Sequence, residues 1–128
     1  MPFELQFNRQ TKLLHCRVEG KIYKEDLEQA LNEIVTSPDY APDVDTIWDV
    51  FEVDLASVDK DLLTAFIDIR ERFPQRGEAR VAIVGNEDLT FGLARMYSGM
   101  SSLMAQKIRV FRDIGSAEDW LMNKQNEQ

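Results

Sequence analysis

The chain has 128 residues, of which 44% are hydrophobic and 30% charged, and its formal net charge is −8. This length suits one domain with its own core and is too short for two domains of ordinary size, while the composition excludes a disordered chain. The negative charge opposes binding to nucleic acid or to an anionic lipid surface.

The single cysteine, Cys16, excludes an intramolecular disulfide and suits a reducing compartment. No apolar run approaches the roughly 20 residues that span a bilayer. The first residues also lack the basic and apolar segments of a signal peptide. We therefore expect a cytoplasmic protein without a membrane span.

Alternating residues at the start of the chain predict a β-hairpin. Apolar side chains recur at every second position over 3–7 and again over 14–18, with a polar turn between the two runs. A period of two is typical of half-buried strands, so we expect an antiparallel pair that ends at Gly20. On this alternation His15 lies on the face opposite Cys16.

The next segment predicts two helices with a strand between them. An amphipathic pattern indicates a first helix from about residue 24 to 36, and the apolar run 46–51 indicates a strand with one charged residue, Asp49. A second amphipathic pattern follows, with Ser57 as its expected N-cap and Pro74 as its stop.

The segment 80–86 is apolar on both faces, ends in Gly-Asn and leads directly into a helix. This is typical of a central parallel strand followed by a crossover helix. A last strand at 107–111 and a short helix capped by Ser116 complete the order ββαβαβαβα. We expect one α/β domain over 1–123 with a mixed, mostly parallel sheet, and a frayed tail at 124–128.

This order resembles the STAS domain, the SpoIIAA-like fold of bacterial anti-sigma-factor antagonists, and more closely the uncharacterised SpoIIAA-like proteins. The likeness spans almost the whole chain. The segments that carry it are Gly20-Lys21-Ile22, Ile47-Trp48-Asp49 near the end of the third strand, Arg80-Val81-Ala82-Ile83-Val84, Arg95-Met96-Tyr97, Val110-Phe111, and Ala117 with Trp120-Leu121. The resemblance implies a regulatory module that acts through protein–protein association.

The resemblance also implies a serine that is phosphorylated within Asp-Ser-Ser-Gly at the start of the second helix. Here the corresponding segment reads Ser57-Val58-Asp59-Lys60, with Val58 at the aligned position and Ser57 one residue away. This departure argues against a phosphorylation switch. A helix N-cap, which contributes about 1 kcal/mol, is the simpler role for Ser57.

Asp49 is the only charged residue in an otherwise apolar strand, and a buried carboxylate needs partners. Parallel sheets bind ligands beyond the carboxyl ends of their strands. Such a rim would gather Asp49, Ser57 and Asn86, together with Glu52, Asp88 and Arg112 or Asp113. A cation or polar ligand could bind there, but a purely structural role for Asp49 is the favoured interpretation.

No motif in the chain specifies a reaction. There is no Cys-x-x-Cys or paired-histidine spacing for a metal, and His15 has no nucleophile motif to serve. Gly85-Asn86 matches neither a Walker A loop nor a dinucleotide-binding glycine pattern. We therefore predict no catalytic residue, metal, cofactor or enzymatic activity, with a metal- or carboxylate-dependent hydrolase as the weakest alternative.

The third helix and the loop after it carry more apolar bulk than a small sheet needs. The residues of this predicted interaction face are Phe91, Met96, Tyr97, Met100 and Met104. Ordinary core packing is the competing interpretation. We predict a non-catalytic interaction module that binds a partner protein or a second copy. The alternative is a small-molecule or lipid carrier, with an apolar pocket between helices and sheet lined by Phe66, Phe91, Met96 or Met100.

Overall fold

A computed structural model describes residues 3–123 of the chain. The predicted tail at 124–128 lies outside the described residues. The elements are β1 (Phe3–Asn8), β2 (Leu13–Gly20), α1 (Lys24–Thr36), β3 (Thr46–Val53), the 3-10 turn η1 (Leu55–Ser57), α2 (Lys60–Glu71), the 3-10 turn η2 (Pro74–Arg76), β4 (Arg80–Val84), α3 (Asp88–Met100), β5 (Lys107–Phe111) and α4 (Ile114–Met122).

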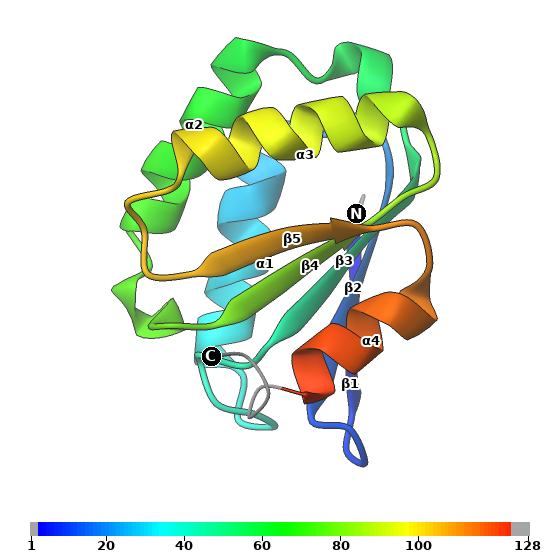
Figure 1. The fold of residues 1–128 in the computed structure, drawn as a ribbon. Helices are drawn as coiled ribbons and strands as arrows, with labels where there is room; N and C mark the ends of the chain where they lie inside the picture. Colours follow the sequence, from blue (N-terminus) through cyan, green and yellow to red (C-terminus); the bar gives the residue numbers. More distant parts are fainter. Residues whose placement is uncertain (1–2, 124–128) are drawn as a thin grey trace.

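The five strands form one sheet in the order β1-β2-β3-β4-β5. β1 and β2 pair antiparallel, and the other neighbours pair parallel, which confirms the predicted fold class. Successive crossovers of the same hand place α1, α2 and α3 on one face of the sheet, and α4 covers the other face (Figure 1).

The alternation of side chains along the strands divides the core into two layers. The α4 layer contains Leu13, Ile47, Ala82, Val84, Ala117, Trp120 and Leu121. The three-helix layer contains Phe3, Leu14, Cys16, Val18, Ala30, Leu31, Ile34, Leu63 and Ile69, among others. His15 points to the α4 side, opposite Cys16, as its position in the alternation predicts.

The helices begin at other caps than predicted. Ser57 ends the turn η1, where its hydroxyl donates to the Asp54 carbonyl at 2.7 Å, and Asp59 caps α2 by accepting the Leu62 N–H at 2.8 Å. Because η1 uses the residues just after β3, the helix starts beyond Ser57. In α4 the cap is Asp113, which accepts the Ser116 N–H at 2.8 Å. Both expected serine caps are therefore wrong.

The third strand is longer than predicted. It runs on to Val53, so Asp49 lies in its middle rather than near its end. Within residues 3–123, no helix has the length and apolar character needed to cross a membrane.

Candidate functional site

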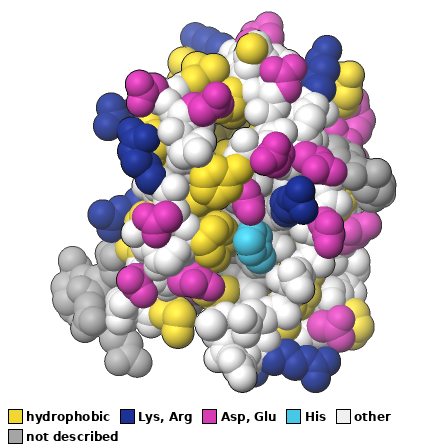
Figure 2. Space-filling view, turned by 90° about the vertical axis from the view of Figure 1, so that its right-hand side faces the viewer, with side chains coloured by type: hydrophobic (Ala, Val, Ile, Leu, Met, Phe, Trp, Pro, Cys, Tyr) yellow, Lys and Arg dark blue, Asp and Glu magenta, His cyan; other side chains and the backbone are white. Residues whose placement is uncertain are grey.

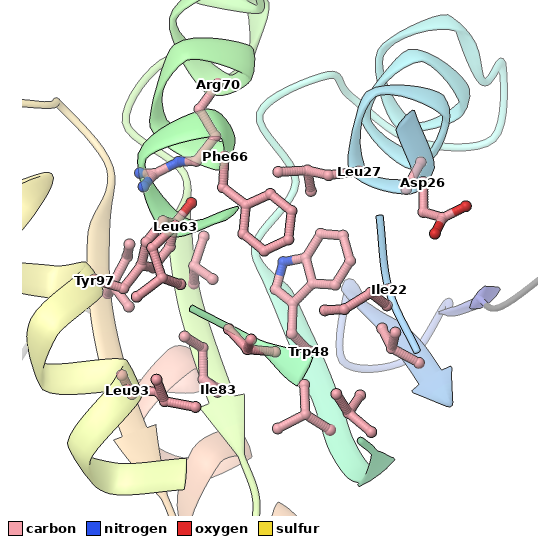
Figure 3. A pocket seen from close by; sticks show the side chains of 18 of the residues that line it. Ile22, Asp26, Leu27, Trp48, Leu63, Phe66, Arg70, Ile83, Leu93 and Tyr97 are labelled. Atoms are coloured by element: carbon pink, nitrogen blue, oxygen red, sulfur yellow. The ribbon is translucent and has the colours of Figure 1, made fainter. Parts of the chain in front are cut away.

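An apolar cavity of about 170 Å³ lies between the sheet and the three helices on one of its faces. Figure 3 shows the Trp48 indole at its centre, with Phe66 of α2 above it and Leu63 of α2 and Leu93 of α3 at the side. The side chains that the sheet contributes are Phe3, Val18, Trp48, Val50, Val53, Val81, Ile83 and Ile108. Almost all of the lining is hydrocarbon.

Small residues on the helices explain why the cavity exists. Ala30 of α1 and Ala94 of α3 are both buried and both line it, and neither side chain reaches far into the space above the sheet. Well-packed interiors rarely contain voids larger than a water molecule. A space of this size in so small a domain is therefore a specific feature of the fold.

One end of the cavity is polar. Arg70 of α2 reaches over the Tyr97 ring, with 5.2 Å from its guanidinium carbon to the ring centroid, and its Nη2 donates to Gln106 Oε1 at 3.2 Å. Gln106 in turn donates to the Gly77 carbonyl at 2.6 Å. Burial raises the pKa of the Tyr97 hydroxyl, and the Arg70 charge opposes that rise. Arg70 thus links α2, α3 and the segment before β5.

Arg76 lies beside this end and is itself buried. Its Nη1 donates to the carbonyls of Pro42 at 2.9 Å and Val44 at 2.7 Å, and its Nη2 donates to Thr46 Oγ1 at 2.9 Å. Burial lowers the pKa of Arg76 to about 10, and the carboxylate of Asp45 is the largest influence opposing the shift. The side chain therefore stays charged at neutral pH and ties η2 to the start of β3.

The opposite end of the cavity lies beside α1 and carries a negative charge. Tyr23, which is more than half exposed, lines the cavity there together with Ile22 and Asp26. The Asp26 carboxylate accepts the Tyr23 N–H at 2.7 Å at the start of α1. Because exposed and buried residues both line this end, it is where the cavity meets solvent.

Asp49 lies on the face of the sheet that α4 covers, where its partner is His15. Its Oδ2 lies 3.0 Å from His15 Nε2, and its Oδ1 accepts the Phe51 N–H at 3.3 Å. In Figure 2 the histidine side chain (cyan) reaches the surface, with acidic side chains (magenta) gathered around it. Within the described residues no further side chain hydrogen-bonds to His15, so the pair does not extend to a catalytic triad. The structural interpretation of Asp49 accounts for these contacts.

The residues of the predicted polar rim do not form one connected site. In the part of the chain that the structure describes, no hydrogen bond or ion pair joins Asp49, Ser57 and Asn86 to one another. Arg112 does connect the ends of β4 and β5, because it donates to the Asn86 carbonyl at 3.4 Å and pairs with Asp88 at 3.5 Å.

The residues of the predicted interaction face do not form one exposed surface either. Met96 is exposed, whereas Phe91, Met100 and Met104 are half-buried, and the Arg112 guanidinium covers the Phe91 ring at 4.2 Å. Tyr97 lines the cavity instead of pointing outward. Of the residues expected to line an apolar pocket, Phe66 does so, and Phe91, Met96 and Met100 do not.

Gly85 serves packing between β4 and α3. A Cβ at this position would lie 2.7 Å from Cγ2 and 2.9 Å from Oγ1 of the buried Thr90. Glycine at this position therefore allows close approach of the strand end to the helix, which is a structural reason for Gly85.

Among residues 3–123, no group of three or more His, Cys, Asp or Glu side chains could hold a metal ion. Cys16 is buried in the three-helix layer, and this burial, together with the negative charges of Asp49 and Glu33, raises the pKa of its thiol. A neutral, buried thiol is a poor nucleophile and a poor metal ligand.

Comparison with known proteins identifies the fold of the chain but indicates no activity. No protein-family model and no curated protein matches the chain. Among solved structures it is similar to an uncharacterised protein of the DUF3478 family from Shewanella loihica PV-4, described as having a SpoIIAA-like fold. The match has 21% sequence identity and a TM-score of 0.63, and covers 93% of this chain and 91% of the other. The chain therefore has a SpoIIAA-like fold, as its sequence resemblance implies.

Proposed function

We propose that this protein is a non-catalytic binding module that holds one small apolar molecule in the cavity between its sheet and the helices α1, α2 and α3. The observation that carries the proposal is the cavity itself, with about 170 Å³ of space lined by hydrocarbon. An apolar cavity of about 150 Å³ in another protein stays dry and binds benzene. The space here therefore suits a molecule of one aromatic ring or a short alkyl chain.

Energetics support the same interpretation. A closed, empty space of 170 Å³ destabilises a fold by about 4 kcal/mol relative to a filled one, and this is an upper limit here because one end of the cavity meets solvent. That is a large part of the total stability of about 5–15 kcal/mol that domains have. A ligand that fills the space restores much of this stability. Larger residues in place of Ala30 and Ala94 would restore it without any ligand.

Toluene should bind wild-type protein and raise its unfolding temperature, because a ligand that binds only the folded state stabilises it by mass action. Ala94→Leu extends a side chain into the cavity, so we expect it to weaken toluene binding at least tenfold while leaving the unliganded protein equally or more stable. The measurements are isothermal titration calorimetry and thermal unfolding with and without toluene.

Ala105→Leu adds the same side chain at an exposed position outside the cavity and should bind toluene like wild type. Absence of toluene binding to the wild-type protein would overturn the proposal. Equal binding by wild type and both variants would show that toluene binds elsewhere on the molecule.

Association through α3 and the segment that follows it is a second candidate function, and exposed apolar side chains favour it. Leu103 is fully exposed and Met96 is 44% exposed, and both lie in the region predicted to contact a partner. Self-association through this surface would bury them against a second copy in a two-fold arrangement.

Sedimentation analysis tests this second candidate. If wild-type protein dimerises through α3, Leu103→Glu should weaken the dimer at least tenfold, because a charge would be placed in an apolar contact. Thr64→Glu, at an exposed position of α2, is the control and should leave the molecular weight unchanged. If the wild-type protein stays monomeric at high concentration, self-association is excluded.

A further inference from the structure

We infer that the natural ligand of the cavity is a small carboxylic acid, with a compact apolar body over Trp48 and a carboxylate that accepts hydrogen bonds from Arg70. This inference rests on the proposed function and adds the chemical class of the ligand and its orientation. By comparison with cavities that hold benzene, the body has roughly six to ten non-hydrogen atoms.

The Arg70 guanidinium is only partly used by the protein. Its Nη2 is bonded to Gln106 and the Tyr97 hydroxyl interacts with the group, but Nη1 is buried and accounts for no hydrogen bond to an acceptor within the described residues. Leaving a buried donor unsatisfied costs about 1–3 kcal/mol, and more when the group is charged. Figure 3 shows this guanidinium reaching between α2 and α3 toward Tyr97, where the polar end of the cavity lies.

The charge of Arg70 is not balanced by a carboxylate of the described residues. Across residues 3–123 no Asp or Glu forms an ion pair with Arg70. Arg76, which also lines the cavity, differs because its donors are occupied by protein oxygens and its charge lies near Asp45 and Asp43. The cavity end therefore carries one positive charge that no carboxylate of the described residues pairs with. A carboxylate matches a guanidinium in charge and planarity, and hydrogen bonds between the two are about twice as strong as neutral ones.

The two ends of the cavity differ in charge. Asp26 lies at the end beside α1, away from Arg70 (Figure 3). An anion placed near Asp26 would be repelled, and the same anion placed near Arg70 would be attracted. The hydrocarbon wall between them offers no other strong partner. The ligand therefore points its carboxylate toward Arg70 and its apolar body toward Trp48.

Hexanoate and its neutral analogue hexanamide test the inference, because they share an alkyl chain and differ in charge. We expect wild-type protein to bind hexanoate at least tenfold more tightly than hexanamide in isothermal titration calorimetry. Arg70→Met keeps an apolar side chain at the cavity and removes the charge, so it should abolish this preference while still binding toluene. Arg95→Met changes the net charge equally at an exposed position of α3 and should keep the preference.

The outcomes separate this inference from the proposed function. Equal affinities of the wild-type protein for hexanoate and hexanamide, or a preference that survives in Arg70→Met, would overturn the carboxylate while toluene binding still supported the apolar cavity. Failure of all three compounds to bind would overturn both. Should Arg70→Met not fold, Arg70→Gln replaces it, and the comparison on wild-type protein remains decisive.

Discussion

Replacing Arg76 with methionine should lower the free energy of unfolding by roughly 3–5 kcal/mol, because it leaves buried acceptors without donors. The guanidinium donates to the carbonyls of Pro42 and Val44 and to the Thr46 hydroxyl, all at 2.9 Å or less. Methionine has a similar stem and no donor, so these oxygens would lose their partner while they remain covered. Urea-induced unfolding, followed by circular dichroism, measures the change.

Arg72→Met is the matched control for this prediction. Arg72 lies four residues earlier and forms an exposed ion pair with Glu28 at 3.1 Å. Exposed pairs contribute between 0 and about 1 kcal/mol, so this variant should unfold close to wild type. If Arg72→Met and Arg76→Met lower the free energy of unfolding by similar amounts, the buried hydrogen bonds of Arg76 contribute no more to stability than the exposed ion pair of Arg72.

The fold was predictable because each element carries its own local pattern. The period of two over 3–7 and the apolar run at 80–84 depend only on neighbouring residues, and strands that alternate with helices allow few topologies. The caps were less predictable. Ser57 and Asp59 are both good N-cap residues, and only the turn η1 between β3 and α2 decides between them.

The sequence predicts that Asp49 needs a partner, but it does not predict which residue that partner is. A carboxylate inside an apolar strand requires a partner, as the sequence indicates. That this partner is His15 depends on the parallel register of β2 and β3, which brings together residues 34 positions apart and has no local signal.

The sequence predicts an apolar pocket between helices and sheet only as an alternative, and of the lining residues that it names only Phe66 is correct, for a related reason. A stripe of apolar residues indicates which face of a helix is buried, but not how closely helices approach one another. Alanine at 30 or 94 fits a filled core as well as a hollow one. One signal was present: Leu63, Phe66 and Arg70 recur at i, i+3 and i+7, which places an arginine on the apolar stripe of α2. Arg76, in an irregular turn, has no such periodicity.

Trp48→Ala should have opposite effects on stability and on binding. The indole packs in the three-helix layer of the core and lines the cavity, so its removal should lower the free energy of unfolding by about 3–5 kcal/mol. It should also enlarge the cavity enough to admit naphthalene, a two-ring molecule that we expect wild-type protein to bind at least tenfold more weakly. Calorimetric titration with naphthalene and urea unfolding measure the two effects.

Trp120→Ala separates the loss of stability from the gain in binding. Trp120 is buried on the α4 face, where it packs against Phe111 with a centroid distance of 5.6 Å and lies 3.9 Å from the Arg80 guanidinium carbon. Its removal should destabilise the protein by a similar amount. Because it lies on the other side of the sheet, it should not improve naphthalene binding.

If Trp48→Ala does not fold, Trp48→Leu opens part of the same space at a smaller loss of stability. Naphthalene binding that improves equally in Trp48→Ala and Trp120→Ala would mean that loosened packing, and not the cavity, accommodates the ligand. An improvement confined to changes at Trp48 would mean that this one side chain limits the size of the ligand. The ligand site would then lie on the face of the sheet under α1, α2 and α3.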